Sequence, residues 1–263
     1  MKKIFLIKQI ASCFKYKDLI IHIATSDIKL KYSKTILGPL WNSLSMGIFV
    51  VAFGFVGSRL WGLDVKNFMP FFCAGFITWT FIATTISEST SILSNHSDTL
   101  KSIKTPYLIF IVSMVIKNMI IFLHHILIFF LICLLLSYDL SIYCLYFIPS
   151  LLIVTLIGIL FSFSWSILCT RFNDLTPLTT NLLQVLFFLT PVFWPAERLQ
   201  GIYFKLIIEL NPMYQILRLI RDPLLGHNIS MNNLLGISLI LGILFLLSIF
   251  VGNKFKNNII YFI

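Results

Sequence analysis

The sequence predicts an all-α integral membrane protein with six transmembrane helices, an N-terminal amphipathic interface helix, and re-entrant outer gate helices between helices 5 and 6. Of its 263 residues, 58% are hydrophobic and only 11% are charged, whereas a soluble domain carries about 25% charged residues. Six apolar runs approach the roughly 20 residues that a bilayer crossing needs. The basic residues gather on one side of these runs, as they do in multi-pass membrane proteins.

Residues 1–34 precede the first apolar run and are predicted to form cytoplasmic interface helices. Eight lysines are interleaved with apolar residues here, so the segment is too charged to span a bilayer and suits a helix that lies along its surface. Lys8 and Gln9 interrupt the apolar stretch that follows the N-terminus, so we do not expect a cleavable signal peptide. The segment is either a simple topogenic anchor or a positively charged collar for an anionic lipid headgroup.

The stretch from Leu37 to Trp41 marks the step from the membrane surface to the membrane interior. Pro39 fits the first turn of a helix, where its missing N–H costs nothing. Trp41 suits the membrane–water interface. We therefore expect Gly38, Pro39 and Trp41 to form a corner between the surface helix and the first crossing.

Residues 35–263 are predicted to form one transmembrane domain. Its crossings are expected at 36–58, 68–87, 107–136, 145–169, 178–194 and 232–252. The third run is too long for one straight crossing, so it must tilt or extend beyond the hydrocarbon. With Lys117 left aside as part of the third crossing, thirteen basic residues lie on the side of the termini and six on the opposite side, which places both termini in the cytoplasm. The formal net charge of +10 therefore does not indicate nucleic-acid binding, because there is no soluble domain to carry a basic face.

Two connecting segments have an unusual composition. Residues 88–106 are very polar but keep one apolar edge, which favours a short amphipathic helix on the cytoplasmic side over an ordinary solvated loop. Residues 190–230 mix prolines and charged residues with apolar ones, and their helical stretches are too short or too charged to span alone. Because non-helical backbone at membrane depth needs protein or water around it, we predict a re-entrant helical pair at the outer face.

The chain lacks the motifs of common catalytic sites. It has no Gly-Lys dipeptide, so it cannot hold a P-loop for ATP, and it has no H-E-x-x-H motif. The five cysteines show no metal spacing. Nearly all acidic residues lie in loops or at interfaces, whereas an ion-coupled carrier usually keeps an ionisable residue mid-membrane. We therefore expect no catalytic residue, no metal and no bound cofactor.

Several short motifs follow one another along the chain. They are Lys29-Leu30-Lys31-Tyr32-Ser33-Lys34 leading into Leu37-Gly38-Pro39-Leu40-Trp41, Pro70-Phe71 through Gly75, Trp79-Thr80-Phe81, Asn118 to His124, Arg171-Phe172-Asn173-Asp174-Leu175, Leu189-Thr190-Pro191-Val192-Phe193-Trp194-Pro195, Asn211-Pro212, and Arg221-Asp222-Pro223-Leu224-Leu225-Gly226. In their order and spacing, the chain resembles the permease subunit of bacterial polysaccharide ABC exporters, a type-2 permease class that exports O-antigen, capsule and teichoic-acid polymers. The resemblance covers essentially the whole chain. Asn173 departs from it, because the family often has a charged residue there, and this puts a charge contact in that turn in doubt.

The resemblance implies a transporter subunit and not an enzyme. Two copies of the chain would form a channel in the bacterial inner membrane, and two copies of a separate ABC ATPase would dock beneath them and bind ATP and Mg²⁺. The substrate would be an O-antigen-like polysaccharide on an undecaprenyl-pyrophosphate lipid. The alternatives are a teichoic-acid or capsule exporter, an ATP-independent membrane carrier, and a membrane-embedded enzyme of polymer assembly.

The resemblance also implies where the working sites lie. Segment 90–104 would be the coupling helix, with Leu93, His96, Asp98, Leu100 and Lys101 facing the ATPase. Segment 195–225 would form the outer gate, with Pro195, Arg198, Asn211, Pro212 and Arg221. The corner at Gly38, Pro39 and Trp41 would border a lateral entrance. Lys29, Lys31 and Lys34 would meet the pyrophosphate there, or serve only as positive-inside anchors.

A long sugar polymer needs a wide path that tolerates different sugars. Aromatic faces stack on the C–H surfaces of sugars without demanding particular hydroxyl groups. The candidates for this path are Phe49, Phe53, Trp79, Phe187, Phe188, Phe193 and Trp194. Trp41 is either the first aromatic of the path or an anchor at the interface.

Overall fold

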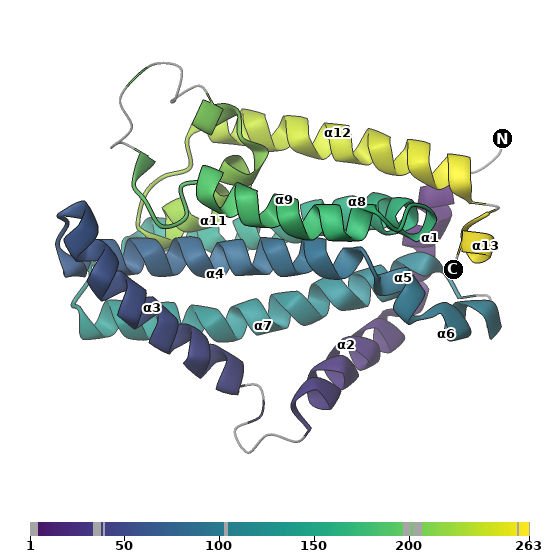
Figure 1. The fold of residues 1–263 in the computed structure, drawn as a ribbon, viewed down its shortest axis with the longest axis horizontal. Coiled ribbons are helices and arrows are strands. Elements are labelled where there is room, and N and C mark those ends of the chain that lie inside the picture. Colours follow the sequence, from purple (N-terminus) through teal and green to yellow (C-terminus); the bar gives the residue numbers. More distant parts are fainter. Residues whose placement is uncertain are drawn as a thin grey trace.

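The computed structural model describes residues 5–33, 38, 40–102, 105–196, 201, 207–256 and 258–262, which form an elongated helical bundle with no strand among them (Figure 1). The central helix is α4 (Val65–Ser89), and α12 (Met231–Phe255) packs on the far side of the helices that surround it. The longer helices in contact with α4 are α3 (Leu40–Trp61), α7 (Tyr107–Leu135), α8 (Phe147–Arg171), α9 (Leu175–Leu189) and α11 (Pro212–Leu224). Any groove along α4 is therefore bounded by several different helices.

Five helical segments are long and apolar enough to cross a membrane, so the chain is a multi-pass membrane protein. They are α3, α4, α7, α12, and the run Ile142–Arg171, in which the 3-10 helix η1 (Ile142–Tyr146) continues into α8. They correspond to the predicted crossings at 36–58, 68–87, 107–136, 145–169 and 232–252. The overlong third run is a single continuous helix of 29 residues.

The fifth predicted crossing, 178–194, is shorter in the structure. α9 has 15 residues, fewer than the roughly 20 that a full crossing needs. The helix ends at Leu189, and Thr190 then takes an extended conformation (φ −93°, ψ 134°), which a following proline favours. The count of six crossings therefore stays a prediction, and so does the re-entrant arrangement of the gate helices.

The N-terminal segment forms two helices, α1 (Phe5–Lys15) and α2 (Lys17–Tyr32). Both dock on the bundle, because α1 contacts α7 and α12 while α2 packs against α7. Ile20, Ala24 and Ile28 of α2 recur every four residues and are all buried, so they form its packing face. Gln9 Oε1 of α1 accepts a hydrogen bond from the Leu108 backbone N–H at 3.2 Å, which fixes α1 at the start of α7.

The two ends of the bundle are built from different parts of the chain. α1, α5 (Ile92–Asn95), α6 (Ser97–Ser102), α13 (Ile259–Phe262) and both chain ends lie at one end, called here the terminal end (Figure 1). The turns from α3 to α4 and from α7 to η1 lie at the opposite end, called the far end. The polar segment 88–106 thus shares an end with both termini. Which side of the membrane this end faces stays a prediction.

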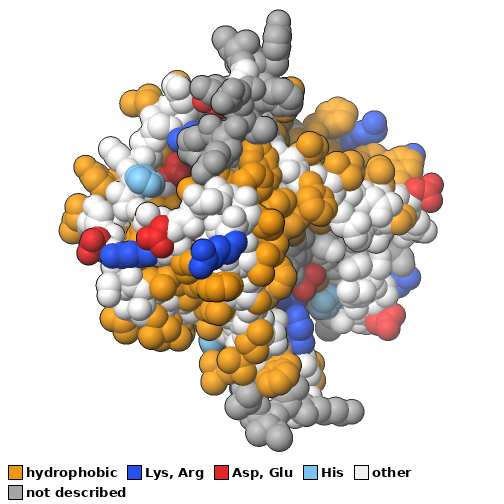
Figure 2. All heavy atoms as spheres, turned by 60° about the vertical axis from the view of Figure 1, so that its left-hand side comes forward, with side chains coloured by type: hydrophobic (Ala, Val, Ile, Leu, Met, Phe, Trp, Pro, Cys, Tyr) orange, Lys and Arg blue, Asp and Glu red, His pale blue; other side chains and the backbone are white. Residues whose placement is uncertain are grey.

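Large apolar side chains are exposed on the outer helices α3, α9 and α12. Trp41, Phe188 and Phe250 are examples from the three helices. Figure 2 shows hydrophobic side chains over much of the surface that it brings forward. In a membrane protein such surface meets lipid or another subunit, so these helices are available for either contact.

Candidate functional site

A continuous cluster of aromatic rings joins α3 to α4. The centroids of Phe49 and Phe76 are 4.7 Å apart, and those of Phe53 and Phe72 are 4.6 Å apart. Both pairs recur at an interval of four residues, so on each helix the two rings share one face. Phe53 also reaches the ring of Phe193 at 5.9 Å, edge to face. The cluster therefore extends from α3 across α4 to the segment after α9.

Phe187 connects this cluster to α9. Its ring centroid lies 5.7 Å from Trp79, 5.3 Å from Phe193 and 5.4 Å from Phe188. Trp194 lies beside them, because its indole N–H donates to the Phe188 carbonyl oxygen at 3.2 Å. All seven aromatic residues proposed for a sugar path are thus gathered in one region, although their path role stays a prediction.

A groove of about 600 Å³ runs between α4 and α9, and we call it the α4–α9 groove. On α4, Ser87 and Glu88 lie three and four residues after Thr84, which itself lies four residues after Thr80, so these polar side chains share a face. The lining residues are Phe76, Trp79, Thr80, Ala83, Thr84, Ser87, Glu88, Thr180, Leu183, Gln184, Phe187 and Phe188. The groove thus combines aromatic rings with hydroxyl and amide groups.

The carboxylate of Glu88 holds a polar network at the end of α4 nearest α5. Lys117 Nζ lies 2.8 Å from Glu88 Oε2, and Asn118 Nδ2 donates to the same oxygen at 3.0 Å. The side chain of Lys117 is only 14% exposed, while that of Glu88 is 31% exposed. The charge of Lys117 is therefore balanced by Glu88 inside the protein, and the exposed part of Glu88 lines the α4–α9 groove.

A second groove, of about 360 Å³, also borders α4 and lies between α3 and α7. It shares Phe76, Thr80 and Thr84 with the α4–α9 groove. Its further polar lining comes from Lys31, Asn42, Ser45, Asn118 and His125. Asn42 Nδ2 lies 3.3 Å from His125 Nε2, which links the first turn of α3 to α7. The two grooves together form one polar and aromatic surface around α4.

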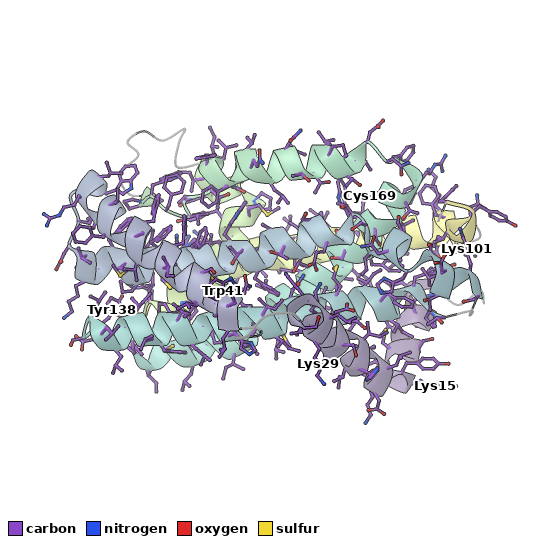
Figure 3. All side chains as sticks on the ribbon, turned by 60° about the horizontal axis from the view of Figure 1, so that its bottom comes forward. Lys15, Lys29, Trp41, Lys101, Tyr138 and Cys169 are labelled. Atoms are coloured by element: carbon purple, nitrogen blue, oxygen red, sulfur yellow. The ribbon has the colours of Figure 1, made fainter. Side chains whose placement is uncertain are left out.

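The predicted entrance corner lies beside this second groove. Figure 3 places Lys29 of α2 and Trp41 of α3 partway along the bundle, away from Lys101 at the terminal end. Gly38 has φ +57°, a left-handed conformation that favours glycine. Lys31 lines the groove, whereas Lys29 is exposed outside it. Lys34 and Pro39 lie outside the described residues.

The predicted coupling segment follows α4 through a short turn and forms α5 and α6. Leu93 and Leu100 are buried and anchor the segment on the bundle. His96 is packed as well, because its ring centroid lies 4.5 Å from Phe110 and its Nδ1 lies 3.0 Å from the Ile92 carbonyl oxygen. The buried side chains of the predicted coupling segment therefore hold it against the rest of the bundle.

The opposite face of the coupling segment is open. Asp98 and Lys101 are exposed on α6, and Lys101 lies at the terminal end in Figure 3. Among the described residues, α6 contacts α5 but no other helix extensively. The segment thus presents charged side chains on a short projecting helix, which is a form suited to a partner surface.

The structure does not bring all the predicted gate residues together: Pro195 and Arg221 share a pocket at the start of α4, whereas Pro212 lines another pocket beside Phe81 and Ile82 of α4. Asn211 caps α11 by accepting from the Met213 N–H at 2.9 Å, and its Nδ2 donates to Thr190 Oγ1 at 3.1 Å. Pro212 occupies the first helical turn, as its missing N–H allows. Pro195 and Arg221 line a pocket of about 690 Å³ with Arg218, Asp222 and Glu209. Arg198 lies outside the described residues.

Two features of this region were not predicted from the sequence. Phe72 and Phe76 carry the cluster across α4, but 26 phenylalanines gave no basis for selecting them. The pair of Glu88 and Lys117 was not predicted either, because Lys117 lies well inside α7 and no sequence pattern shows that this turn meets the end of α4. Among the described residues, no group of His, Cys, Asp or Glu is placed to hold a metal ion.

Comparison with known proteins gives consistent matches. The family model for the ABC-2 type transporter matches residues 19–225. The O-antigen export system permease protein RfbA of Myxococcus xanthus is 22% identical over 213 residues, which cover 81% of this chain and 82% of that protein. A protein of the same name from Klebsiella pneumoniae is 25% identical over 72 residues, or 27% of this chain and 28% of that protein. The family match includes α3, α4, α7, α8, α9 and α11.

Proposed function

Because the chain belongs to the ABC-2 type transporter family, we propose that it is the transmembrane subunit of an ATP-driven exporter that moves a lipid-linked, O-antigen-like polysaccharide across the bacterial inner membrane. The relative from Myxococcus xanthus, which matches most of the chain, supports this substrate class by its name. In the proposal, both termini and the segment 88–106 face the cytoplasm.

The observation that carries the proposal is the surface around α4. Two grooves share Phe76, Thr80 and Thr84 and continue into the aromatic cluster at α9. Rings there can stack on the C–H faces of sugars, while hydroxyl and amide side chains exchange hydrogen bonds with sugar hydroxyls. Such a surface holds a sugar polymer without fixing one sequence of sugars, as an export path requires.

The proposed assembly contains two copies of the chain and two copies of a separate ABC ATPase. Exposed apolar residues on α3 and α9, such as Phe49 and Phe188, flank the grooves. A second copy of the chain placed against them would complete the wall of a channel. The projecting α6, with Asp98 and Lys101 exposed, would dock on the ATPase. ATP and Mg²⁺ would bind to that partner.

The lipid headgroup would enter beside the corner between α2 and α3. Lys31 lines the groove that opens there, and Lys29 is exposed on the same helix. Both cations can attract a pyrophosphate, since anionic headgroups favour nearby Lys and Arg. Trp41, which is exposed at the start of α3, would border this entrance.

An export assay tests the proposal directly. The chain is co-expressed with an ABC ATPase subunit from the same organism in a bacterial strain that lacks its own exporter, and polysaccharide at the cell surface is measured. We expect export with the active ATPase and none when the P-loop lysine of the ATPase is replaced. Export that continues without ATP hydrolysis would indicate a carrier, and the absence of export with both subunits present would refute the proposal.

A further inference from the structure

The α4–α9 groove has an unusual charge pattern for a path through a membrane. Among the described residues that line it, Glu88 is the one charged side chain. The rest of its polar lining consists of Thr80, Thr84, Ser87, Thr180 and Gln184, which are all uncharged. Pores for anions and phosphates are lined by Arg or Lys. The described part of this groove offers no such residue.

The charge of Glu88 is already balanced inside the protein. Lys117 Nζ lies 2.8 Å from Glu88 Oε2, and Asn118 Nδ2 donates to the same atom at 3.0 Å. Within the described chain, both contacts converge on Oε2, so the second oxygen, Oε1, is the one that a ligand in the groove can reach. A carboxylate oxygen accepts hydrogen bonds and donates none. It therefore suits the hydroxyl groups of a sugar, whereas it offers neither a hydrogen-bond donor nor a net positive charge to a phosphate or a carboxylate.

Aromatic rings lie along the same groove. Phe188 is 66% exposed, and its ring centroid is 5.4 Å from that of Phe187. Phe187 is half-buried, and its ring centroid lies 5.7 Å from that of Trp79, which is buried and also lines the groove. Phe187 and Phe188 thus form an apolar surface on the α9 wall of the groove, across from the hydroxyl groups of α4.

We propose that the α4–α9 groove binds an uncharged saccharide, with Phe187 and Phe188 stacking on its C–H faces and Glu88 accepting hydrogen bonds from its hydroxyls. The inference rests on the proposed function and narrows the substrate to a neutral glycan, as opposed to a polyanion such as a polymer of glycerol phosphate. Lys117 and Asn118 are positioning residues, because they hold the carboxylate and set the net charge at this point to zero. Gln184 and Ser87 supply further hydrogen bonds along the path.

The test uses the complete transporter, this chain with its ATPase, in lipid nanodiscs. The probes are a panel of neutral oligosaccharides (gluco-, manno- and galacto-oligosaccharides) and two polyanions of similar length, poly(glycerol phosphate) and polysialic acid. Dissociation constants give a ratio of neutral to anionic binding. For the unmodified protein, at least one neutral probe should bind about tenfold more tightly than either polyanion.

Variants of the ion pair make the test specific. Glu88→Gln leaves the charge of Lys117 unbalanced, so the ratio should move about tenfold toward the polyanions. Lys117→Gln should move it in the opposite direction, and the double variant should return to a neutral preference with weaker binding, because the carboxylate is gone. Asp174→Asn removes an equal charge at an exposed site outside the groove, and its ratio should not change. A role in stability alone would weaken all probes together and leave the ratio constant.

The outcomes separate this inference from the proposed function. Four outcomes would overturn the neutral-glycan inference while leaving an exporter in place. They are ATP-dependent transport of a polyanion, equal binding of both probe classes, binding of neither class, and a binding ratio that Glu88→Gln leaves unchanged. Absence of ATP-dependent transport of any polymer, in a preparation that still shows the predicted binding ratios, would refute the exporter and preserve the assignment of the groove.

Discussion

Arg221 of α11 donates from Nη1 to the carbonyl oxygen of Pro191 at 2.6 Å. The arginine is only 4% exposed, and its guanidinium carbon lies 4.6 Å from the ring centroid of Phe71 on α4. Pro191 belongs to the break that ends α9. One buried side chain therefore joins α4, α9 and α11 at the far end of the bundle, where the outer gate is proposed.

Replacement of Arg221 by Met should destabilise this end. The change removes a hydrogen bond to a charged group and leaves the Pro191 carbonyl without that donor, at a cost of about 2–3 kcal/mol in the free energy of unfolding. Thermal unfolding of the purified protein in detergent should show a lower midpoint. Arg59→Met is the matched control, because Arg59 is exposed at the end of α3. Equal midpoints for the two variants would contradict the structural role of Arg221.

Replacement of Gly75 by Ala should push the break after α9 away from α4. A Cβ atom at Gly75 would lie 2.7 Å from the backbone oxygen of Val192, which is too close for either to remain in place. Overpacking of this kind costs about 1–3 kcal/mol. A Cβ at Gly242 of α12 meets no atom within 4 Å, so Gly242→Ala should be neutral or stabilising by about 0.5–1 kcal/mol. Thermal unfolding of both variants checks the contrast.

α9 should loosen when its link to α8 is cut. Trp165 Nε1 donates to Thr179 Oγ1 at 3.0 Å, and Thr179 is the buried side chain of α9. Thr179→Val leaves the indole N–H without its acceptor, at a cost of about 1–3 kcal/mol. Hydrogen exchange followed by mass spectrometry should then show faster exchange of the α9 amides. Thr176→Val, one turn earlier, should leave the exchange unchanged, and unchanged exchange in both variants would rule out the link.

Charge reversal on α6 should separate the chain from its ATPase without unfolding it. Asp98 and Lys101 are both exposed, so the double variant Asp98→Lys, Lys101→Glu should keep the melting temperature within experimental error. Co-purification with the ATPase should fall about tenfold, because charges at an interface set complementarity. Lys66→Glu, at the far end, serves as the control. Full co-purification of the α6 variant would contradict the assignment of this segment to coupling.

Cys13 of α1 should react slowly with alkylating reagents in the folded protein. Burial raises the pKa of the Cys13 thiol from 9.0 to about 11, so at pH 8 the reactive thiolate is about a hundredfold scarcer than in the unfolded chain. The rate of labelling by iodoacetamide, followed by mass spectrometry, should rise from pH 8 to pH 11 in the folded protein. The same rate at pH 8 before and after denaturation would show that α1 does not dock on the bundle.

The sequence predicts which kinds of residues form much of the proposed site, but it does not predict how they are placed relative to one another. The sequence makes Phe49, Phe53 and Trp79 candidates because large rings in apolar runs can line a path, and their ring contacts in the structure place them in one cluster. Phe72 and Phe76 have the same local sequence character as many lipid-facing phenylalanines. What distinguishes them is the contact of α4 with α3, and no periodicity within α4 can reveal that contact.

The membrane as solvent, the positions of the long apolar helices and the polar segments between them could be predicted from the sequence, because they depend on local composition and on the length of a bilayer crossing. Three features appear only in the folded chain: the face of α4 that meets α9, the pairing of Glu88 with Lys117 of α7, and the hydrogen bond from Arg221 to Pro191. Such contacts depend on helix rotation and packing, which bring together residues that are far apart in the chain: Asn118 lies 30 positions from Glu88, and Arg221 lies 30 positions from Pro191. Each groove is lined by residues from several helices, so the groove and its chemical character form only when those helices pack together.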